Sequence, residues 1–405
     1  MAKNKFNKKT IEDVNVKGKR VLLRCDLNVP IHDGVITDDQ RIRASVPTIN
    51  YLATHGARIV ICSHLGKPEK RQDLAPVCKA LSKACKKPIK FLASDRVVDD
   101  KVVAAVNELK DGQIVMLQNT RWRDEESKND DGFSKELASL CDIFVNDAFG
   151  TCHRAHSSTY GVSKFVPISV GGYLIKAELD KLCNYIDNPK RPFVTILGGS
   201  KIADKLKVID KALDRSDVVI IGGGMSYTFM KGFGYEIGKS MLDESKIDYC
   251  MQMVEKAKKL HKELVLPVDC VAAKDFPEPI DNKNVEARVF DMKHFDKDYS
   301  GFDAGPETIK KMLKYMVKAK TILWNGPVGL FENQKYAVGT YCIAKCMAGL
   351  TDKGVVTIVG GGDSASAVNQ FKLADKMTHV STGGGATLDF LKGEPLPGIE
   401  CLTDK

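Results

Sequence analysis

The chain has 405 residues, more than one hydrophobic core usually serves, so its length predicts two domains. Hydrophobic residues make up 43% and charged residues 28%, which is ordinary for a globular protein and argues against disorder. The net charge of +9 suits an anionic ligand, but it is equally compatible with weak nucleic-acid binding.

The N-terminal end of the chain is rich in lysine, but no apolar stretch follows it, so we expect no secretory signal. No apolar run approaches the roughly 20 residues of a membrane span, and we expect no membrane partner. Twelve cysteines are scattered without C-x-x-C spacing, and Cys62, Cys270 and Cys342 lie in apolar segments where a small buried thiol is expected. The sequence therefore predicts no disulfide framework and a reducing, cytoplasmic location.

Short runs rich in Val, Ile and Leu alternate with amphipathic stretches, the pattern of β-α units around a parallel sheet. In the first half we expect strands at residues 21–27, 58–62, 114–117 and 143–145, with helices at 38–54, 74–86 and 132–140. In the second half we expect strands at 193–197, 218–221, 264–268, 321–324, 355–359 and 379–381. The predicted fold class is α/β, with two doubly wound, parallel-sheet (Rossmann-like) domains joined by a hinge helix.

The predicted hinge begins at the pair Gly171 and Gly172, continues with helical apolar spacing and stops near Pro189 and Pro192. It divides the chain into a first domain at 1–171, a connecting helix at 172–188 and a second domain at 189–390.

The segments that follow the predicted strands differ between the two halves, and ligands of open parallel sheets bind beyond these strand ends. In the first half the segments carry side chains that suit a small anionic substrate: Asp26, Asn28, His64, Lys67, Arg121 and Arg154. In the second half they carry glycines at 198–199, 222–224, 360–362 and 383–385, whose backbone N–H groups can approach phosphates. One half is interpreted as a small-acid site and the other as a nucleotide site.

Each motif also has a plainer structural interpretation. A glycine triplet can be only a tight turn into a helix, although four such segments at one sheet edge favour phosphate binding. Asp363 either caps a helix or coordinates the Mg²⁺ that bridges nucleotide phosphates, and the residues alone leave both roles open. His153 and His156 lack further metal ligands nearby, so a hydrogen-bonding or anion-contacting role is favoured. Cys342 and Cys346 have the spacing of one helix face, which favours core packing.

Two familiar nucleotide motifs were sought. No G-x-x-x-x-G-K-[ST] string is present, which excludes a P-loop enzyme. Residues 360–365 match G-x-G-x-x-A, but no acidic residue follows the next strand to hold a ribose, which disfavours a nicotinamide-dependent dehydrogenase. A non-catalytic nucleic-acid binder is the other alternative, and no basic cluster interleaved with aromatics supports specific nucleic-acid binding.

A series of longer strings covers essentially the whole chain: RCDLNVP at 24–30, QRIR at 40–43, SHLG at 63–66, NDAFGTCHRAH at 146–156, LGGSKIADK at 197–205, GGGM at 222–225, WNGPVGLFE at 324–332, GGGD at 360–363 and STGGGA at 381–386. Taken together, the strings resemble the phosphoglycerate kinase family. The resemblance implies reversible phosphoryl transfer between 1,3-bisphosphoglycerate and Mg-ADP, giving 3-phosphoglycerate and Mg-ATP, in glycolysis and gluconeogenesis. It also implies a monomer, hinge closure around the two substrates, and a return of residues 391–405 to the first domain.

Site residues follow from the resemblance, motif by motif. The phosphoglycerate is expected on Asp26, Asn28, Arg41, His64, Lys67, Arg121 and Arg154. The nucleotide, ATP or ADP, is expected on Lys205, Gly222, Gly223, Glu332, Gly360, Gly361, Gly362, Asp363 and Ser364, with Mg²⁺ on Asp363. Arg41 and Lys201 are expected to neutralise charge on the migrating phosphoryl group, assisted by the N–H groups of Gly361 and Gly362.

The sequence departs from the family pattern at a few of these places. Lys67 stands where the family has arginine, which removes bidentate anion binding at that position. Gln118 and Trp122 replace the usual Glu and Phe, and Ser364 replaces a Thr while keeping the hydroxyl. None of these changes removes an expected catalytic group.

Overall fold

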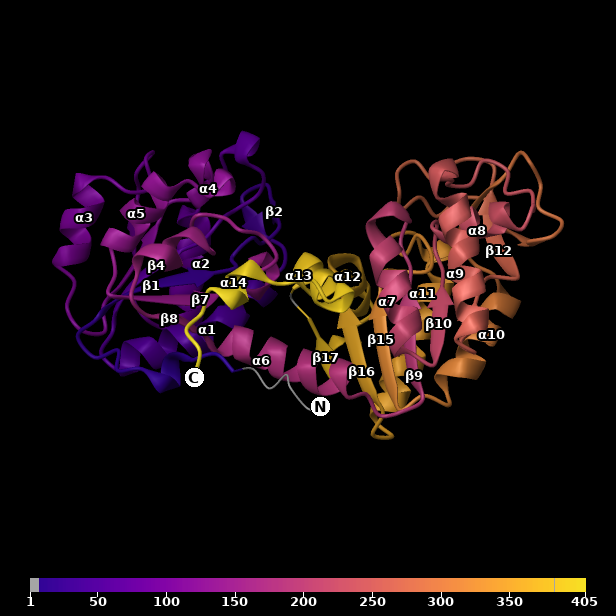
Figure 1. The fold of residues 1–405 in the computed structure, drawn as a ribbon. Coiled ribbons are helices and arrows are strands. Elements are labelled where there is room, and N and C mark those ends of the chain that lie inside the picture. Colours follow the sequence, from indigo (N-terminus) through magenta and orange to yellow (C-terminus); the bar gives the residue numbers. More distant parts are fainter. Residues whose placement is uncertain (1–6, 382) are drawn as a thin grey trace. The chain divides into compact units, whose positions relative to one another are not determined.

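A computed structural model of the protein describes residues 7–381 and 383–405. The chain divides into two compact units. Unit 1 contains the chain up to Asn184 together with Pro395–Lys405, and unit 2 contains Tyr185–Glu394. Each unit is built on a six-stranded parallel sheet with helices packed against it (Figure 1), which confirms the predicted class of two parallel-sheet α/β domains.

The sheet of unit 1 has the strand order β5-β6-β4-β1-β7-β8. Its strands are β1 (Arg20–Cys25), β4 (Arg58–Cys62), β5 (Lys90–Leu92), β6 (Ile114–Leu117), β7 (Ile143–Asp147) and β8 (Ser169–Gly171). Its helices are α1 (Gln40–Thr54), α2 (Ala75–Cys85), α3 (Asp100–Asn107), α4 (Glu125–Lys128), α5 (Asp131–Ser139), α6 (Tyr173–Leu182) and α14 (Pro397–Glu400). The chain leaves β1 for β4 on one side and later returns to β7 on the other, so the direction of winding changes at β1.

Both faces of this sheet are covered, and the pleat of β1 shows how. Val21 and Leu23 belong to a core shared with α1 and α2, whereas Leu22 belongs to a second core shared with α3 and α5. Successive side chains of a strand point to opposite faces, so a strand covered on both sides must be apolar throughout. This is why continuous apolar runs located the central strands.

The sheet of unit 2 has the strand order β11-β10-β9-β15-β16-β17. Its strands are β9 (Phe193–Leu197), β10 (Val218–Ile221), β11 (Glu263–Val265), β15 (Thr321–Asn325), β16 (Val356–Gly360) and β17 (His379–Val380). Its helices are α7 (Leu206–Arg215), α8 (Ser226–Gly232), α9 (Ile247–Lys259), α10 (Pro306–Met316), α11 (Val338–Thr351), α12 (Gly362–Gln370) and α13 (Gly384–Lys392). Counted along the chain, this order is 3-2-1-4-5-6, the order of dinucleotide-binding folds.

Two small sheets were not predicted. One is an antiparallel sheet of order β13-β12-β14 in unit 2, made of β12 (Asp269–Ala273), β13 (Arg288–Asp291) and β14 (Ser300–Ala304). The other is the hairpin of β2 (Ile31–His32) and β3 (Val35–Ile36) in unit 1. β13 is largely exposed and carries no apolar alternation, so the pattern that located the other strands is missing. The predicted strand at 264–268 is also shortened, because β11 ends at Val265.

Helix α6 occupies most of the predicted hinge segment. The buried carboxylate of Asp147, at the end of β7, accepts hydrogen bonds from the N–H groups of Leu174 and Ile175 at 2.8 and 3.2 Å. A carboxylate in this position satisfies two of the N–H groups that a helix leaves without partners. After Leu182 the chain continues as one π-helical turn, Cys183–Asp187, and the division between the units falls inside this turn.

The C-terminal segment packs within unit 1, where α14 lies among the earlier elements in Figure 1. The N–H of Gly398 donates to the carbonyl of Cys152 at 2.9 Å, and Lys8 forms an ion pair with Asp404. The segment of unit 1 starts at Pro395, and residues 391–394 remain in unit 2. In the described part of the chain no helix is long and apolar enough to span a lipid bilayer.

All twelve cysteines are thiols, and they all lie in the described part of the chain. Cys62 and Cys270 are buried, and burial raises the pKa of each thiol to about 12. Cys342 is only partly buried, and Cys346 packs one helical turn further on against the core of unit 2.

Candidate functional sites in the two units

In unit 1, the predicted polar residues connect loops that follow neighbouring strands of the sheet. Asp26 follows β1, is buried, and accepts a hydrogen bond from Arg41 Nη1 at 2.8 Å. Arg41 lies in the first turn of α1, and its side chain is still 32% exposed. Asn28 Oδ1 accepts the N–H of Gly66 at 2.8 Å, which ties the loop after β1 to the loop after β4. Asp26 therefore orients a cation that remains accessible to a ligand.

His64 lies in the loop after β4 and is almost entirely buried. Its Nδ1 is 3.2 Å from Arg24 Nη2. Burial holds the pKa of His64 well below its usual value, and the positive charges of Arg24 and Arg121 lower it further. The imidazole is therefore neutral at neutral pH.

Arg121 and Arg154 complete a cluster of positive charge in unit 1. Arg121 follows β6 and donates from Nη1 to the carbonyl of Gly66, while Arg154 follows β7 and is exposed. Burial lowers the pKa of Arg121, and the charges of Arg154 and Arg24 lower it further. Burial and the same three arginines reduce the pKa of His156 to about 4. Cations that perturb one another in this way share one region, and such a region favours a ligand with several negative charges.

The pair His153 and His156 does not form part of a larger set of metal ligands. Arg154 Nε lies 3.0 Å from His153 Nε2 and donates to it. Among residues 7–381 and 383–405, no group of three or more His, Cys, Asp or Glu side chains could hold a metal ion.

Three of the four departures from the family pattern lie around one loop of unit 1: Lys67, Gln118 and Trp122. Lys67 is exposed and precedes the single turn Pro68–Lys70. Gln118 Nε2 donates to Asp73 Oδ1 at 3.0 Å, and Trp122 Nε1 donates to the carbonyl of Gln72 at 3.0 Å. Gln118 and Trp122 therefore hold the end of the loop that carries Lys67.

In unit 2, the glycine segments approach one another at the carboxyl edge of the sheet. The N–H of Gly199 donates to the carbonyl of Pro327 at 2.8 Å. A Cβ on Gly198 would lie 2.2 Å from the same carbonyl, and a Cβ on Gly222 would lie 2.6 Å from a methyl carbon of Val328. Close packing is therefore sufficient to explain these glycines. Gly362 differs, since nothing lies within 4 Å of the place that its Cβ would take.

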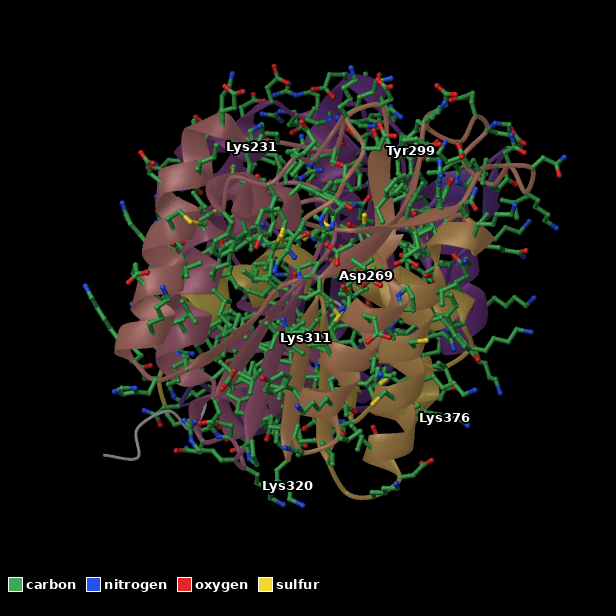
Figure 2. All side chains as sticks on the ribbon, turned by 90° about the vertical axis from the view of Figure 1, so that its right-hand side faces the viewer. Lys231, Asp269, Tyr299, Lys311, Lys320 and Lys376 are labelled. Carbon is green, nitrogen blue, oxygen red and sulfur yellow. The ribbon has the colours of Figure 1, made fainter. Side chains whose placement is uncertain are left out.

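These loops open onto a cavity of about 390 Å³, a volume within the range of small-molecule sites. Four of the predicted site residues line it: Gly222, Gly223, Glu332 and Asp363. The cavity lies wholly within unit 2, and its floor includes buried Asp269. Figure 2 looks onto unit 2 and shows Asp269 near the centre of this face, between Tyr299 and Lys311.

Part of the cavity lining was missed by the sequence analysis. This part includes Phe276 after β12, Phe302 of β14, and Lys239 and Met241 of the loop after α8. The rings of Phe276 and Phe302 meet edge to face with centroids 5.7 Å apart. Apolar rings of this kind suit contact with an aromatic base. The only signal in the sequence was one aromatic residue after β12 and one in the short strand β14, and single residues of this kind show no period.

Asp363 lies at the start of α12 with its side chain exposed. The helix cap is Gly361, with φ +89°, and not Asp363, so the capping alternative for this aspartate is wrong. Ser364 is fully buried, and its hydroxyl accepts the N–H of Gly326 at 2.6 Å. Ser364 therefore holds the loop after β15, while Asp363 faces the cavity.

The two predicted lysines of unit 2 differ in environment. Lys205 is buried and donates from Nζ to the carbonyl oxygen of Asn325 at 2.8 Å and to its side-chain oxygen. Lys201 is exposed. Neither is among the residues that line the cavity, although both follow the strand β9, whose loop lines it.

The remaining predicted glycines lie beside α13. A Cβ on Gly360 would be 3.1 Å from the methyl group of Thr387 in that helix. Gly384 and Gly385 begin α13, and Gly383 donates to Ser381 Oγ at 3.0 Å. Thr382, which belongs to the same predicted segment, lies outside the described residues.

Comparison with known proteins identifies the family of this chain. A family model described as phosphoglycerate kinase matches residues 11–394. The chain belongs to the phosphoglycerate kinase family. It is 54% identical over 404 residues to the phosphoglycerate kinase of Clostridium tetani, covering 99% of each chain, and 52% identical over 403 residues to that of Clostridium botulinum strain Alaska E43, covering 98% of this chain and 100% of the other.

Solved structures of the family share the fold. The phosphoglycerate kinase of Coxiella burnetii is 38% identical with a TM-score of 0.83, and that of Pyrococcus horikoshii is 31% identical with the same score. Each comparison covers 97% of this chain and 98% of the other. The resemblance inferred from the motifs is therefore confirmed. As a phosphoglycerate kinase, the protein transfers a phosphoryl group between ATP and the carboxyl group of 3-phosphoglycerate, and the dehydrogenase and non-catalytic alternatives are wrong.

Proposed function

We propose that this phosphoglycerate kinase binds 3-phosphoglycerate on unit 1 and the Mg-nucleotide on unit 2. The observation that carries the proposal is the difference between the two sites. Unit 1 gathers arginines around a neutral histidine, whereas unit 2 has a glycine-lined cavity with an aromatic wall and an exposed carboxylate at its edge. A small trianionic acid needs the first set of groups, and a nucleotide needs the second.

In unit 1, Asp26 orients Arg41, and Asn28 joins two of the loops that hold the ligand. Arg121 and Arg154 supply fixed donors for the phosphate or carboxylate oxygens. His64 supplies an uncharged donor, and Lys67 reaches the ligand from an exposed loop as a point charge.

In unit 2, the base would lie against the rings of Phe276 and Phe302, and the phosphates would follow the glycine loops. Gly362 leaves the N-terminus of α12 uncovered, so its N–H group and that of Gly361 can approach phosphate oxygens. Glu332, which lines the cavity, would hold the ribose. Lys205 would exchange its bonds to Asn325 for phosphate oxygens.

The residues present also fit a magnesium ion. Mg²⁺ prefers one or two carboxylates together with phosphate oxygens and water, and Asp363 offers an exposed carboxylate at the phosphate end of the cavity. When bound, the ion would neutralise charge on the nucleotide phosphates. Asp363 would hold it there.

Transfer itself needs little from the protein beyond positioning and charge. The carboxylate of 3-phosphoglycerate is already ionised at neutral pH, so no general base is required. Arg41 of unit 1 and Lys201 of unit 2 would together neutralise the oxygens of the migrating phosphoryl group. The attacking carboxylate oxygen must come within about 3–3.5 Å of the phosphorus atom, in line with the leaving oxygen. We therefore propose that the units close around α6 and its π-helical turn when both ligands are bound. We further propose that the enzyme acts as a monomer in the cytoplasm.

Crossed variants test the assignment of the two sites by calorimetry. Asp363→Ala should weaken Mg-nucleotide binding and leave 3-phosphoglycerate binding nearly unchanged, and Arg121→Ala should do the reverse. Asp375→Ala, which removes another exposed carboxylate of unit 2, is the matched control and should change neither affinity. Equal loss of both affinities in either variant would show that the assignment is wrong.

Small-angle scattering tests the closure. The radius of gyration should fall when both ligands are present and should change much less with either one alone. A scattering curve that both ligands leave unmoved, in an enzyme that turns over normally, would refute closure.

A further inference from the structure

A series of buried polar contacts links His64 to Arg24, Ser158 and Glu126. Arg24 Nη2 lies 3.2 Å from His64 Nδ1, and Arg24 Nε donates to Ser158 Oγ at 2.7 Å. Ser158 in turn donates from its hydroxyl to Glu126 Oε1 at 2.5 Å and from its N–H to Glu126 Oε2 at 3.0 Å. Their exposed fractions are 3% for His64, 1% for Arg24, and 0% for Ser158 and Glu126.

The donor and the acceptor of each hydrogen bond in the series from His64 to Glu126 are determined by the chemistry of the groups. A guanidinium group has donors and no acceptor, so Arg24 must donate at both ends. Ser158 Oγ therefore accepts from Arg24 and turns its own hydrogen toward the carboxylate of Glu126. At the other end, His64 Nδ1 must accept, because a hydrogen on that nitrogen would face a second donor at 3.2 Å. A neutral imidazole with a lone pair on Nδ1 carries its hydrogen on Nε2.

The series from His64 to Glu126 also brings a positive and a negative side chain together. The positive charge of Arg24 and the negative charge of the Glu126 carboxylate compensate one another through the hydroxyl of Ser158. A buried cation without such a partner would be costly, so removal of Glu126 or Ser158 disturbs the position of Arg24 as well as its energy. The charges of Arg24, Arg41, Arg121 and Arg154 also act on His64 and oppose its protonation, in addition to its burial.

We infer that Glu126, Ser158 and Arg24 are positioning residues that hold His64 as the neutral tautomer with its hydrogen on Nε2, so that this hydrogen is donated to phosphoglycerate. The last step rests on the proposed role of His64 in substrate binding. His64 then serves as a donor of fixed direction among cations. An imidazolium in the same place would add a further positive charge to a crowded cluster, and the other tautomer would present a lone pair to an anion.

The tautomer is measured directly by ¹⁵N NMR of the full-length enzyme with labelled histidine, without any substrate. The resonances of His64 are identified by their loss in His64→Gln. At neutral pH we expect Nε2 to be protonated and Nδ1 to be unprotonated in the wild type. Ser158→Ala and Arg24→Lys should shift the ring toward a mixture of tautomers. Ser216→Ala removes an equally buried hydroxyl from its 2.7 Å bond with Thr195 in unit 2, and it should leave the His64 signals unchanged.

Kinetics test what the tautomer does. Loss of one well-directed hydrogen bond to a charged group corresponds to about a tenfold loss or more, so Ser158→Ala and Arg24→Lys should raise KM for 3-phosphoglycerate by about tenfold and barely change KM for ATP. His64→Gln, which keeps an N–H donor near the Nε2 position, should bind 3-phosphoglycerate better than His64→Leu. Ser216→Ala should match the wild type in both KM values.

The results of these experiments distinguish a failure of the tautomer inference from a failure of the proposed substrate site. A wild-type His64 with hydrogen on Nδ1, or on both nitrogens, would overturn the inference whatever the kinetics. If the tautomer is as expected but His64→Leu binds 3-phosphoglycerate normally, the substrate role of His64 is wrong. If Arg24→Lys does not fold, Ser158→Ala still decides the question, because it removes only one hydroxyl.

Discussion

Replacing Gly223 by alanine should destabilise unit 2 and weaken nucleotide binding together. Gly223 follows β10 with φ +69°, and an added Cβ would lie 2.8 Å from both the nitrogen and the oxygen of Gly199 and 2.9 Å from the carbonyl oxygen of Pro327. The left-handed conformation costs a residue with a side chain about 1–2 kcal/mol. All three short contacts are with backbone atoms that cannot rotate away, and forced insertion of a methyl group adds about 1–3 kcal/mol. The expected loss of unfolding free energy is therefore about 2–5 kcal/mol.

Substitutions at two other glycines, measured by urea unfolding, separate the backbone cost from the packing cost. Gly354 has φ +82° but nothing within 4 Å of its Cβ position, so Gly354→Ala should show only the backbone cost of about 1–2 kcal/mol. Gly349 lies exposed in α11 with open space around it, so Gly349→Ala should stabilise the protein by about 1 kcal/mol. Because Gly199 and Pro327 line the cavity, only Gly223→Ala should also raise KM for ATP, with KM for 3-phosphoglycerate unchanged.

Equal losses of unfolding free energy in Gly223→Ala and Gly354→Ala would refute this prediction, because the contacts with the Gly199 and Pro327 backbone would then cost nothing. A Gly223→Ala variant that is strongly destabilised but retains the wild-type KM for ATP would also refute it. In that case the close approach of the loops would not shape the nucleotide cavity.

Three further predictions concern charged groups. Lys67→Ala should raise KM for 3-phosphoglycerate and scarcely move that for ATP, while Lys67→Arg should be tolerated; an unchanged KM in the alanine variant would make Lys67 a surface charge. Arg41→Ala and Lys201→Ala should each lower kcat by about 10²-fold or more. The loss of kcat in the double variant should be smaller than the product of the two single losses, since both residues act on one phosphoryl group. A loss equal to that product would mean that the two residues act independently. Burial raises the pKa of Asp147 to about 6 from an ordinary value of 3.8, so the stabilisation from its bound proton is complete below about pH 4 and is lost as pH rises through 6. The wild type should therefore lose stability relative to Asp147→Asn across this window, and parallel urea profiles would contradict the shifted pKa.

Much of the fold could be predicted because its central strands are covered on both faces. Continuous apolar runs marked β4, β6, β9 and β10 at the residues where the structure has them. The site loops followed from the same observation, since parallel strands bring their carboxyl ends to one edge. Glycine segments and charged loops were therefore assigned to two sites before any contact was known.

The edges of the sheets were harder to predict. β5 and β8 have three residues each, too few to show any period. In the antiparallel sheet of unit 2, β13 is largely exposed and carries no apolar alternation. The strands of that sheet are defined by pairing with each other, and local sequence contains no record of that pairing. The aromatic wall of the cavity was missed for this reason.

The residue types at the strand ends can be read directly from the amino-acid sequence, and with them the family and its chemistry. The partners of those residues depend on the folded chain. Lys205 meets Asn325 across 120 positions of the chain, and Arg24 meets Ser158 across 134. Such pairs form because burial removes water from polar groups and leaves each of them only the partners that the fold brings near. A direction of hydrogen bonding such as that of Arg24, Ser158 and Glu126 behind His64 therefore exists only in the folded protein.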